Sequence, residues 1–169
     1  MLTAAVLATV LSSTSFTPVH LTRSYTQRIA APASVVFPLM GPSGERKWAG
    51  PTWSPDFLFP RDARDQAGAV FRTSHGGRET IWTLTVFDEK TLRVEYVQVS
   101  PGHHVAQLAV QLAPDGDART RAEITYTWTG LSATGNAFIE RHRGAHFDES
   151  MSVWEKELND YLSAAASKR

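Results

Sequence analysis

The chain has 169 residues, with 17 basic and 17 acidic side chains, 42% hydrophobic residues and no cysteine. A chain of this length can bury a sizeable core as one domain without metals or disulfides. The balanced charge excludes a general binder of nucleic-acid phosphates, which needs a basic surplus, and the lack of Cys excludes disulfides, thiol nucleophiles and cysteine-ligated metals.

Residues 1–16 form a small, mostly apolar run that is similar to the hydrophobic part of a signal peptide. The first basic residue is Arg23, so the basic leading region of a signal peptide is missing. The run is also short for a membrane span, so no stable membrane insertion is expected. We expect residues 1–18 to be an N-terminal extension or a weak signal-like segment, followed by a single domain at 19–165. The expected location is cytoplasmic, with export as the alternative if residues 1–16 act as a signal peptide.

Residues 20–30 alternate between two kinds of side chain, which predicts a half-buried strand. A short helix is expected to begin near Ala31, with Pro32 in its first turn and Pro38 limiting its length. Residues 43–60 are expected to be mostly loop, although residues 45–48 fit one helical turn. The charged side chains of that turn could gate a pocket mouth, or simply form a charged surface turn.

Alternating segments separated by turn signals such as Gly76-Gly77 predict more strands. These segments are residues 69–75, 79–87, 92–99, 103–112 and 121–129. Within the second segment, Trp82, Leu84 and Val86 are expected to share one face. His104 begins the apolar face of its strand, and His103 is expected to point the other way. Strands joined by such tight turns form an antiparallel meander with one apolar face that needs cover.

The last third of the chain predicts that cover. Apolar side chains recur there at the three-and-four spacing of an amphipathic helix, at Phe147, Met151, Trp154, Leu158, Tyr161 and Leu162. The apolar residues upstream of Gly144 lie on a different side of a helical wheel, so a break is expected near that glycine. The prediction is an α+β fold in which a curved antiparallel sheet of about six or seven strands wraps around a long C-terminal helix.

This order of elements, together with several short stretches, resembles the SRPBCC superfamily of START, birch-pollen-allergen and polyketide cyclase/dehydrase-like proteins. The stretches are residues 31–37, 76–82, 94–97, 100–102, 125–129, 136–138, 154–155 and 161–162. They mark turns and packing and contain no catalytic signature. The resemblance implies the helix-grip fold, with a deep cavity between sheet and helix that holds hydrophobic or amphipathic small molecules. The superfamily includes carriers, receptors, cyclases, dehydratases and chaperone activators, so the fold leaves the function open.

The inward faces of the predicted elements provide candidate ligand-binding residues with aromatic walls, a few hydroxyl groups and one imidazole. They are Tyr25, Phe71, Trp82, Tyr96, His104, Tyr126, Trp128, Met151 and Trp154. The alternative is that these side chains simply fill a core. His104 is the one candidate acid–base group, because histidine titrates near neutral pH. The favoured interpretation is nevertheless a half-exposed histidine at a strand end.

No metal site and no cofactor are predicted. His142 and His146 have the spacing of two ligands on one helical face, but no third ligand is evident and we expect both to be surface histidines. The leading hypothesis is a binding protein for a hydrophobic or aromatic small molecule. One alternative is a polyketide cyclase/dehydratase-like enzyme that uses His104 and a cavity tyrosine. The other is a protein-interaction module of chaperone-activator type, with the aromatic loop at residues 48–59 as its contact. The sequence indicates no oligomeric state.

Overall fold

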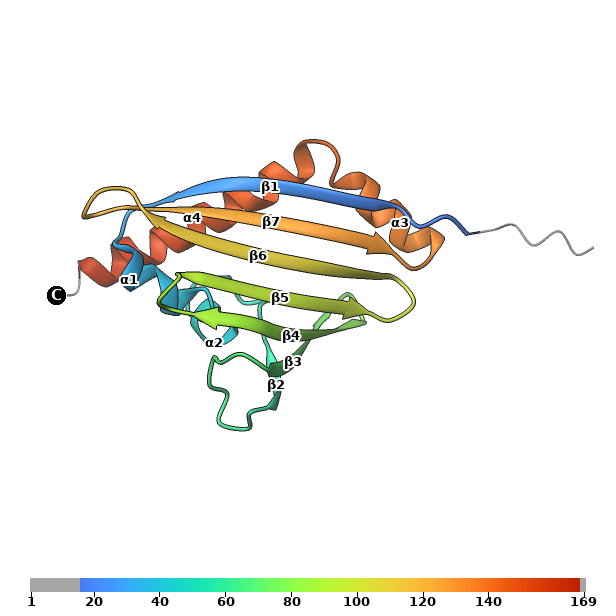
Figure 1. The fold of residues 1–169 in the computed structure, drawn as a ribbon, viewed down its shortest axis with the longest axis horizontal. Helices are drawn as coiled ribbons and strands as arrows, with labels where there is room; N and C mark the ends of the chain where they lie inside the picture. The colour runs from blue at the N-terminus through green and yellow to red at the C-terminus, as the bar shows by residue number, and fades with distance from the viewer. Residues whose placement is uncertain (1–15, 168–169) are drawn as a thin grey trace, which may run out of the picture.

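The computed structural model describes residues 16–167, which contain one seven-stranded antiparallel sheet with a long helix along one face (Figure 1). The strands are β1 (His20–Ile29), β2 (Asp56–Phe59), β3 (Ala69–His75), β4 (Arg78–Asp88), β5 (Arg93–Ser100), β6 (His104–Pro114) and β7 (Thr120–Gly130). The helices are α1 (Ala33–Val36), the short 3₁₀ helix η1 (Phe37–Leu39), α2 (Pro42–Glu45), α3 (Ala133–Arg141) and α4 (Ala145–Ala166). Residues 1–15, which hold nearly all of the signal-like segment, lie outside the described part of the chain.

The strand order β1-β7-β6-β5-β4-β3-β2 is a meander whose last strand also pairs with the first strand of the chain. Side chains alternate along each strand, because successive residues of a strand point to opposite faces. On β7, for example, Ala122, Ile124 and Tyr126 are buried. The opposite face of the same strand carries threonine hydroxyls that bond to those of β1, such as Thr127 to Thr22 at 3.0 Å. The sheet therefore has one apolar face, and the predicted α+β architecture is confirmed.

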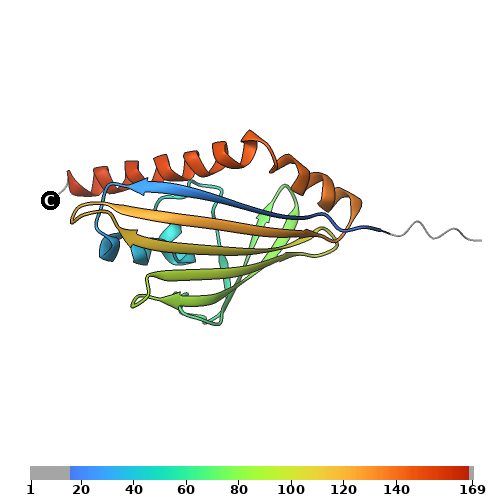
Figure 2. The same ribbon diagram turned by 45° about the horizontal axis from the view of Figure 1, so that its top comes forward.

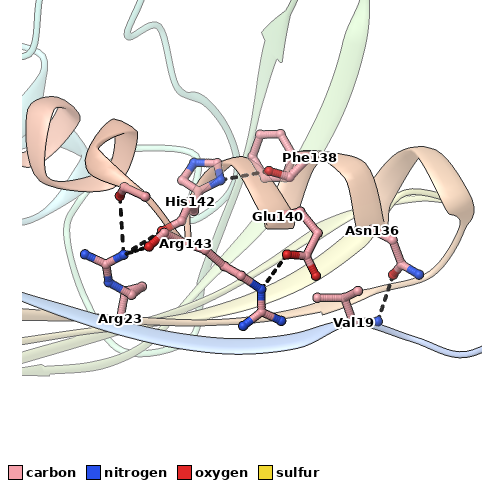
Figure 3. Close-up of polar contacts among 8 residues, drawn as sticks. Val19, Arg23, Asn136, Phe138, Glu140, His142 and Arg143 are labelled. Atoms are coloured by element: carbon pink, nitrogen blue, oxygen red, sulfur yellow. Dashed lines mark hydrogen bonds and ion pairs between the residues drawn. The ribbon is translucent and has the colours of Figure 1, made fainter.

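The helical break predicted near Gly144 is also confirmed, and Figure 2 shows α3 and α4 running end to end along the same side of the sheet. The guanidinium group of Arg23 on β1 donates hydrogen bonds to the carbonyl oxygens of His142 (2.9 Å) and Arg143 (2.5 Å), as Figure 3 shows. It also pairs with Asp148 of α4 at 2.9 Å. These contacts satisfy carbonyl groups that a helix end leaves without partners, and they fix the break to the sheet.

Three local expectations were wrong. Residues 56–59 form the edge strand β2 rather than a loop, and they pair with β3. The register of β4 against β5 shifts between Leu84 and Val86, so Phe87 rather than Val86 returns to the inner face. Phe87 packs against Phe37 there, with ring centroids 4.7 Å apart.

The third error concerns His103, which was expected to point away from His104. His103 lies in the turn before β6, where its backbone N–H donates to the Ser100 carbonyl oxygen at 3.0 Å. The alternation of the strand therefore does not extend to it. Its side chain is buried, and its Nδ1 lies 2.7 Å from Nδ1 of His104.

Candidate functional site

The nine predicted ligand-binding residues all contribute to the region between the sheet and α4. Phe71, Trp82, Tyr96, His104, Tyr126, Trp128 and Met151 are buried, and Tyr25 and Trp154 are half-buried and pack against the core. The structure therefore brings them to one side of the sheet. Whether they contact a ligand stays a prediction.

One group of aromatic rings occupies the part of this region under β3, β4 and β5. Phe71 and Trp82 stack with their centroids 5.8 Å apart and their planes within 7°. Tyr96 contacts both rings edge-on. From the segment before β2, Trp53 packs edge-on against the same two rings. Edge-to-face and offset stacking are the favourable arrangements of aromatic pairs, so this group forms a rigid wall.

A second group of rings lies under β7, where α3 meets α4. Tyr126 and Trp128 stack with centroids 4.8 Å apart, and Phe147 of α4 contacts both rings edge-on. The imidazole of His142 packs against the rings of Trp128 and Phe138 in tilted arrangements, with centroid distances of 4.9 and 4.7 Å. The inner surface is thus lined by two aromatic walls.

The most unusual side chain near these walls is Glu45, the last residue of α2. Only 6% of Glu45 is exposed, and burial, followed by repulsion from Asp65, raises the pKa of its carboxyl group well above 4.5. Burial raises the pKa of the Tyr96 and Tyr126 hydroxyl groups, and the charge of Glu45 raises both further. The carboxyl group therefore lies near a phenol of each aromatic wall.

The carboxyl group of Glu45 has no hydrogen-bond partner among the described residues. Yet no fully enclosed side-chain oxygen or nitrogen of residues 16–167 lacks such a partner. Both statements hold only if the carboxyl oxygens border space that a water molecule or a ligand atom can reach. The same argument applies to the hydroxyl group of Tyr126.

Local packing explains how α2 brings a carboxyl group inside. A Cβ on Gly44 would collide with the carbonyl oxygen of Pro38, so only glycine lets α2 lie this close to η1. The backbone N–H groups of Ser43 and Gly44 donate to the carboxylate of Asp65 at 3.0 and 3.3 Å. The indole N–H of Trp48 donates to the Leu39 carbonyl oxygen at 2.8 Å. These contacts fix the position of Glu45.

Sequence reasoning placed Glu45 in a charged turn, at the mouth of a pocket or on the surface, and did not identify it as an interior residue. Its neighbours Arg46 and Lys47 are indeed exposed. The usable signal was spacing, because Glu45 and the buried Trp48 are three residues apart and lie on the same side of a helical turn.

A cleft of about 230 Å³ lies where β3, β4, β5 and β6 approach α3. Its lining includes two predicted residues, Trp82 and His104, together with Arg78, Gln98 and Phe138. His104 stacks on Phe138 with centroids 4.7 Å apart and planes within 21°. The cleft thus joins the first aromatic wall to helix α3.

The environment of His104 makes it a weak base. Burial, followed by repulsion from His103, lowers the pKa of His104 to about 4. Since the two Nδ1 atoms are 2.7 Å apart, the Nδ1–H of one ring donates a hydrogen bond to the Nδ1 of the other. At neutral pH His104 is an uncharged, packed side chain.

The expectation that His142 and His146 are surface histidines was half right. His146 is exposed, but His142 is buried and its Nδ1 lies 2.9 Å from the Phe138 carbonyl oxygen (Figure 3). Their ring centroids are 5.2 Å apart. Within residues 16–167, no three His, Cys, Asp or Glu side chains are grouped as metal ligands.

Comparison with known proteins identifies the fold. No family model and no curated protein matches the chain, but solved structures do. Norcoclaurine synthase from Thalictrum flavum superimposes with a TM-score of 0.64 and 9% identity, covering 96% of each chain. An uncharacterized protein from Rhizobium leguminosarum has a TM-score of 0.63 and 14% identity, covering 88% of this chain and 97% of its own. For Ara h 8.0201 the TM-score is 0.60 and the identity 13%, with 86% and 99% covered.

At these identities the likeness shows the fold alone, and it confirms the helix-grip architecture predicted from the sequence. Norcoclaurine synthase has also been solved in complex with dopamine and hydroxybenzaldehyde, in a structure with a TM-score of 0.61 and 10% identity that covers 82% of this chain and 86% of its own. Among residues 16–167, no helix is long and apolar enough to cross a membrane.

Proposed function

We propose that this protein binds a hydrophobic or aromatic small molecule between the curved sheet and helix α4. The observation that carries the proposal is a pair of buried polar groups, the Glu45 carboxyl and the Tyr126 hydroxyl, which have no hydrogen-bond partner among residues 16–167. Buried polar groups are normally hydrogen-bonded. Their free oxygens, set between two aromatic walls, are the combination expected of a small-molecule site.

The fold supports this proposal. The same architecture holds dopamine and hydroxybenzaldehyde in norcoclaurine synthase. The proposed ligand of the present chain is a molecule with at least one aromatic ring, because stacked and edge-on rings provide most of the surface on both sides of Glu45.

The two other hypotheses have less support. The low pKa of His104 does not suit a general base at neutral pH, which weakens the cyclase/dehydratase hypothesis. In the interaction hypothesis, the aromatic loop was to contact a partner, yet Trp48 is buried and Trp53 packs on the first aromatic wall. Only Leu58 and Phe59 of that segment are exposed large hydrophobic residues, at 46% and 55%.

The test is a measurement of ligand retention and ligand uptake. Native mass spectrometry of the purified protein should reveal a retained compound of low mass, and the neutral aromatic dye prodan should bind saturably with a blue-shifted emission. The variant Met151→Ala, which changes a buried side chain of α4, should shift the dye affinity by about fivefold, which corresponds to about 1 kcal/mol.

The matched control is Val153→Ala, two residues further along α4, since Val153 is 55% exposed. This variant should bind the dye as the wild type does. Failure to find any retained compound, together with no saturable uptake of prodan, would contradict the proposed function.

A further inference from the structure

The surroundings of Glu45 also indicate which class of ligand the proposed site binds. A buried carboxyl group without a partner destabilises a folded protein, so the chemistry around it indicates which ligand atom completes it. Three features of that environment are relevant: the charges nearby, the aromatic faces, and the basic side chains.

The charges near Glu45 are negative. Asp65 lies close enough to raise the pKa of Glu45 by repulsion. Both carboxylate oxygens of Asp65 accept backbone N–H groups at the start of α2, from Ser43 and Gly44. A ligand group entering beside Glu45 therefore meets a negative potential.

The basic side chains near the site are committed elsewhere. Arg46 follows Glu45, but its guanidinium donates to the Pro55 carbonyl oxygen and lies over the ring of Phe57. Arg23, on the inner side of β1, is held by the carbonyl oxygens at the α3–α4 break and by Asp148. Neither of these two arginines is positioned to neutralise Glu45.

The aromatic groups beside Glu45 complete the pattern. The hydroxyl of Tyr96 donates to the Met40 carbonyl oxygen at 2.6 Å, which holds that ring beside α2. Tyr126 belongs to the opposite wall, and its hydroxyl has no hydrogen-bond partner in the described part of the chain. Ring faces attract cations through their quadrupole, and carboxylates attract them by charge.

We infer that Glu45 binds a protonated amine, so that the ligand of this site is an aromatic amine in which the ammonium lies between Glu45 and the Tyr126 hydroxyl. This inference rests on the proposed function. Binding is non-covalent and its proton balance is simple: the ammonium keeps its proton, and the carboxylic acid of Glu45 releases one to solvent as the ion pair forms.

A neutral hydroxyl group would fit the same space, and it provides the decisive comparison. An alcohol would accept a hydrogen bond from the Glu45 acid and release no proton. Moving two charges out of water offsets much of the attraction within a buried ion pair. The expected signature is therefore selectivity for amine over alcohol, with proton release, rather than unusually tight binding.

The experiment uses isothermal titration calorimetry with matched probes, 2-phenylethylamine against 2-phenylethanol and tryptamine against tryptophol. The wild type should prefer the amine of each pair by about tenfold or more, as expected for a charge-assisted hydrogen bond. Titrations at a series of pH values above 4.5, in buffers of different ionisation enthalpy, should detect a released proton for the amines alone, because burial raises the pKa of the Glu45 carboxyl group.

The Glu45→Gln variant should lose the preference for the amines, so that the amine and the alcohol of each pair bind to it with equal affinity. The matched control is Glu149→Gln on α4, which changes an exposed carboxyl group. This variant should bind the amines and the alcohols with the same affinities as the wild type. If Glu45→Gln does not fold, proton release by the wild type still tests the inference.

The outcomes separate the two proposals. Equal binding of amine and alcohol, amine binding without proton release, or an amine preference that survives in Glu45→Gln overturns the inference and leaves the proposed function intact. If no member of either pair binds and prodan also fails to bind, the proposed function itself is refuted.

Discussion

The buried histidines His103, His104 and His142 should make the folded protein less stable at acidic pH. His104 is buried, stacks on Phe138 and faces the Nδ1 atom of His103. Burial, then the neighbouring His103, lowers the pKa of His104 from 6.5 to about 4. Burial also lowers the pKa values of His103 and His142. Protonation of any of these rings therefore opposes folding.

The sign and size of the effect follow from the difference in proton binding between the two states. Between about pH 4 and 6.5 the unfolded chain binds a proton at His104 that the folded protein does not, so the free energy of unfolding rises with pH in this window. The stabilisation is complete above pH 6.5 and is lost as the pH falls towards 4. For His104 alone, the difference between the pKa values of the unfolded and folded states corresponds to roughly 3 kcal/mol of stability. That is a large share of the 5–15 kcal/mol typical of a folded domain.

Urea unfolding followed by tryptophan fluorescence at a series of pH values between about 4 and 7 measures this directly. The variant His104→Gln keeps a polar group that can pair with His103 but cannot titrate. Its free energy of unfolding should vary less with pH than that of the wild type, by up to about 3 kcal/mol over the window. The matched control is His75→Gln in the exposed β3–β4 hairpin, which should follow the wild-type curve. Parallel curves for wild type and His104→Gln would refute the reasoning.

Three further predictions concern stability. Because the pKa of Glu45 is raised, the folded protein binds a proton that the unfolded chain has released, so the contribution of Glu45 to stability should fall as the pH rises above 4.5, opposite in sign to that of His104. Glu45→Gln should remove this contribution, so that the slope of the free energy of unfolding against pH differs from that of the wild type by up to about 1.4 kcal/mol per pH unit, measured by urea unfolding. Ser132→Ala removes the side-chain oxygen that accepts the Gly135 N–H at 3.2 Å at the start of α3, and thermal unfolding should show a loss of about 1 kcal/mol. Arg23→Met leaves the carbonyl groups at the α3–α4 break without their donor, so hydrogen exchange should accelerate in the first turn of α4, while unchanged protection there would contradict this account.

Much of the fold was predictable because its signals are local. On β6, His104 and every second residue to Leu112 are buried, as alternation alone indicates. The break at Gly144 was predictable from two apolar stripes that one straight helix cannot present to one surface. The inward direction of eight of the nine candidate residues follows from the same periodicities, and His104 follows as the first residue of its strand.

The features that were missed depend on distant partners. The bulge that turns Phe87 inward arises from the pairing of β4 with β5. The sequence of residues 84–88 contains no local signal that predicts it. Strand β2 is only four residues long and exists because β3 provides its hydrogen-bond partners. His103 belongs to a turn, where the period of two no longer applies.

Glu45 is the clearest case of a site residue that local pattern cannot find. Its burial requires Gly44 to lie against Pro38, Asp65 to hold the start of α2, and Tyr96 of β5 to bond to the Met40 carbonyl. A charged residue in a Pro- and Gly-rich segment is usually exposed. Only the assembled fold reveals that this one faces the interior.

The contacts that hold α2 in place do not explain why residue 45 carries a carboxyl group. Strain and unsatisfied polar groups concentrate at functional sites, where the surrounding structure holds them in place. The anchors of α2 act on its backbone and on Trp48, and none of them satisfies the Glu45 carboxyl oxygens. A side chain selected for stability alone would be apolar, since burying a carboxyl group without a partner is unfavourable. A substitution such as Glu45→Gln, expected to stabilise the protein at neutral pH and to weaken its selectivity for amines, would show that the destabilising carboxyl group is retained for the ligand.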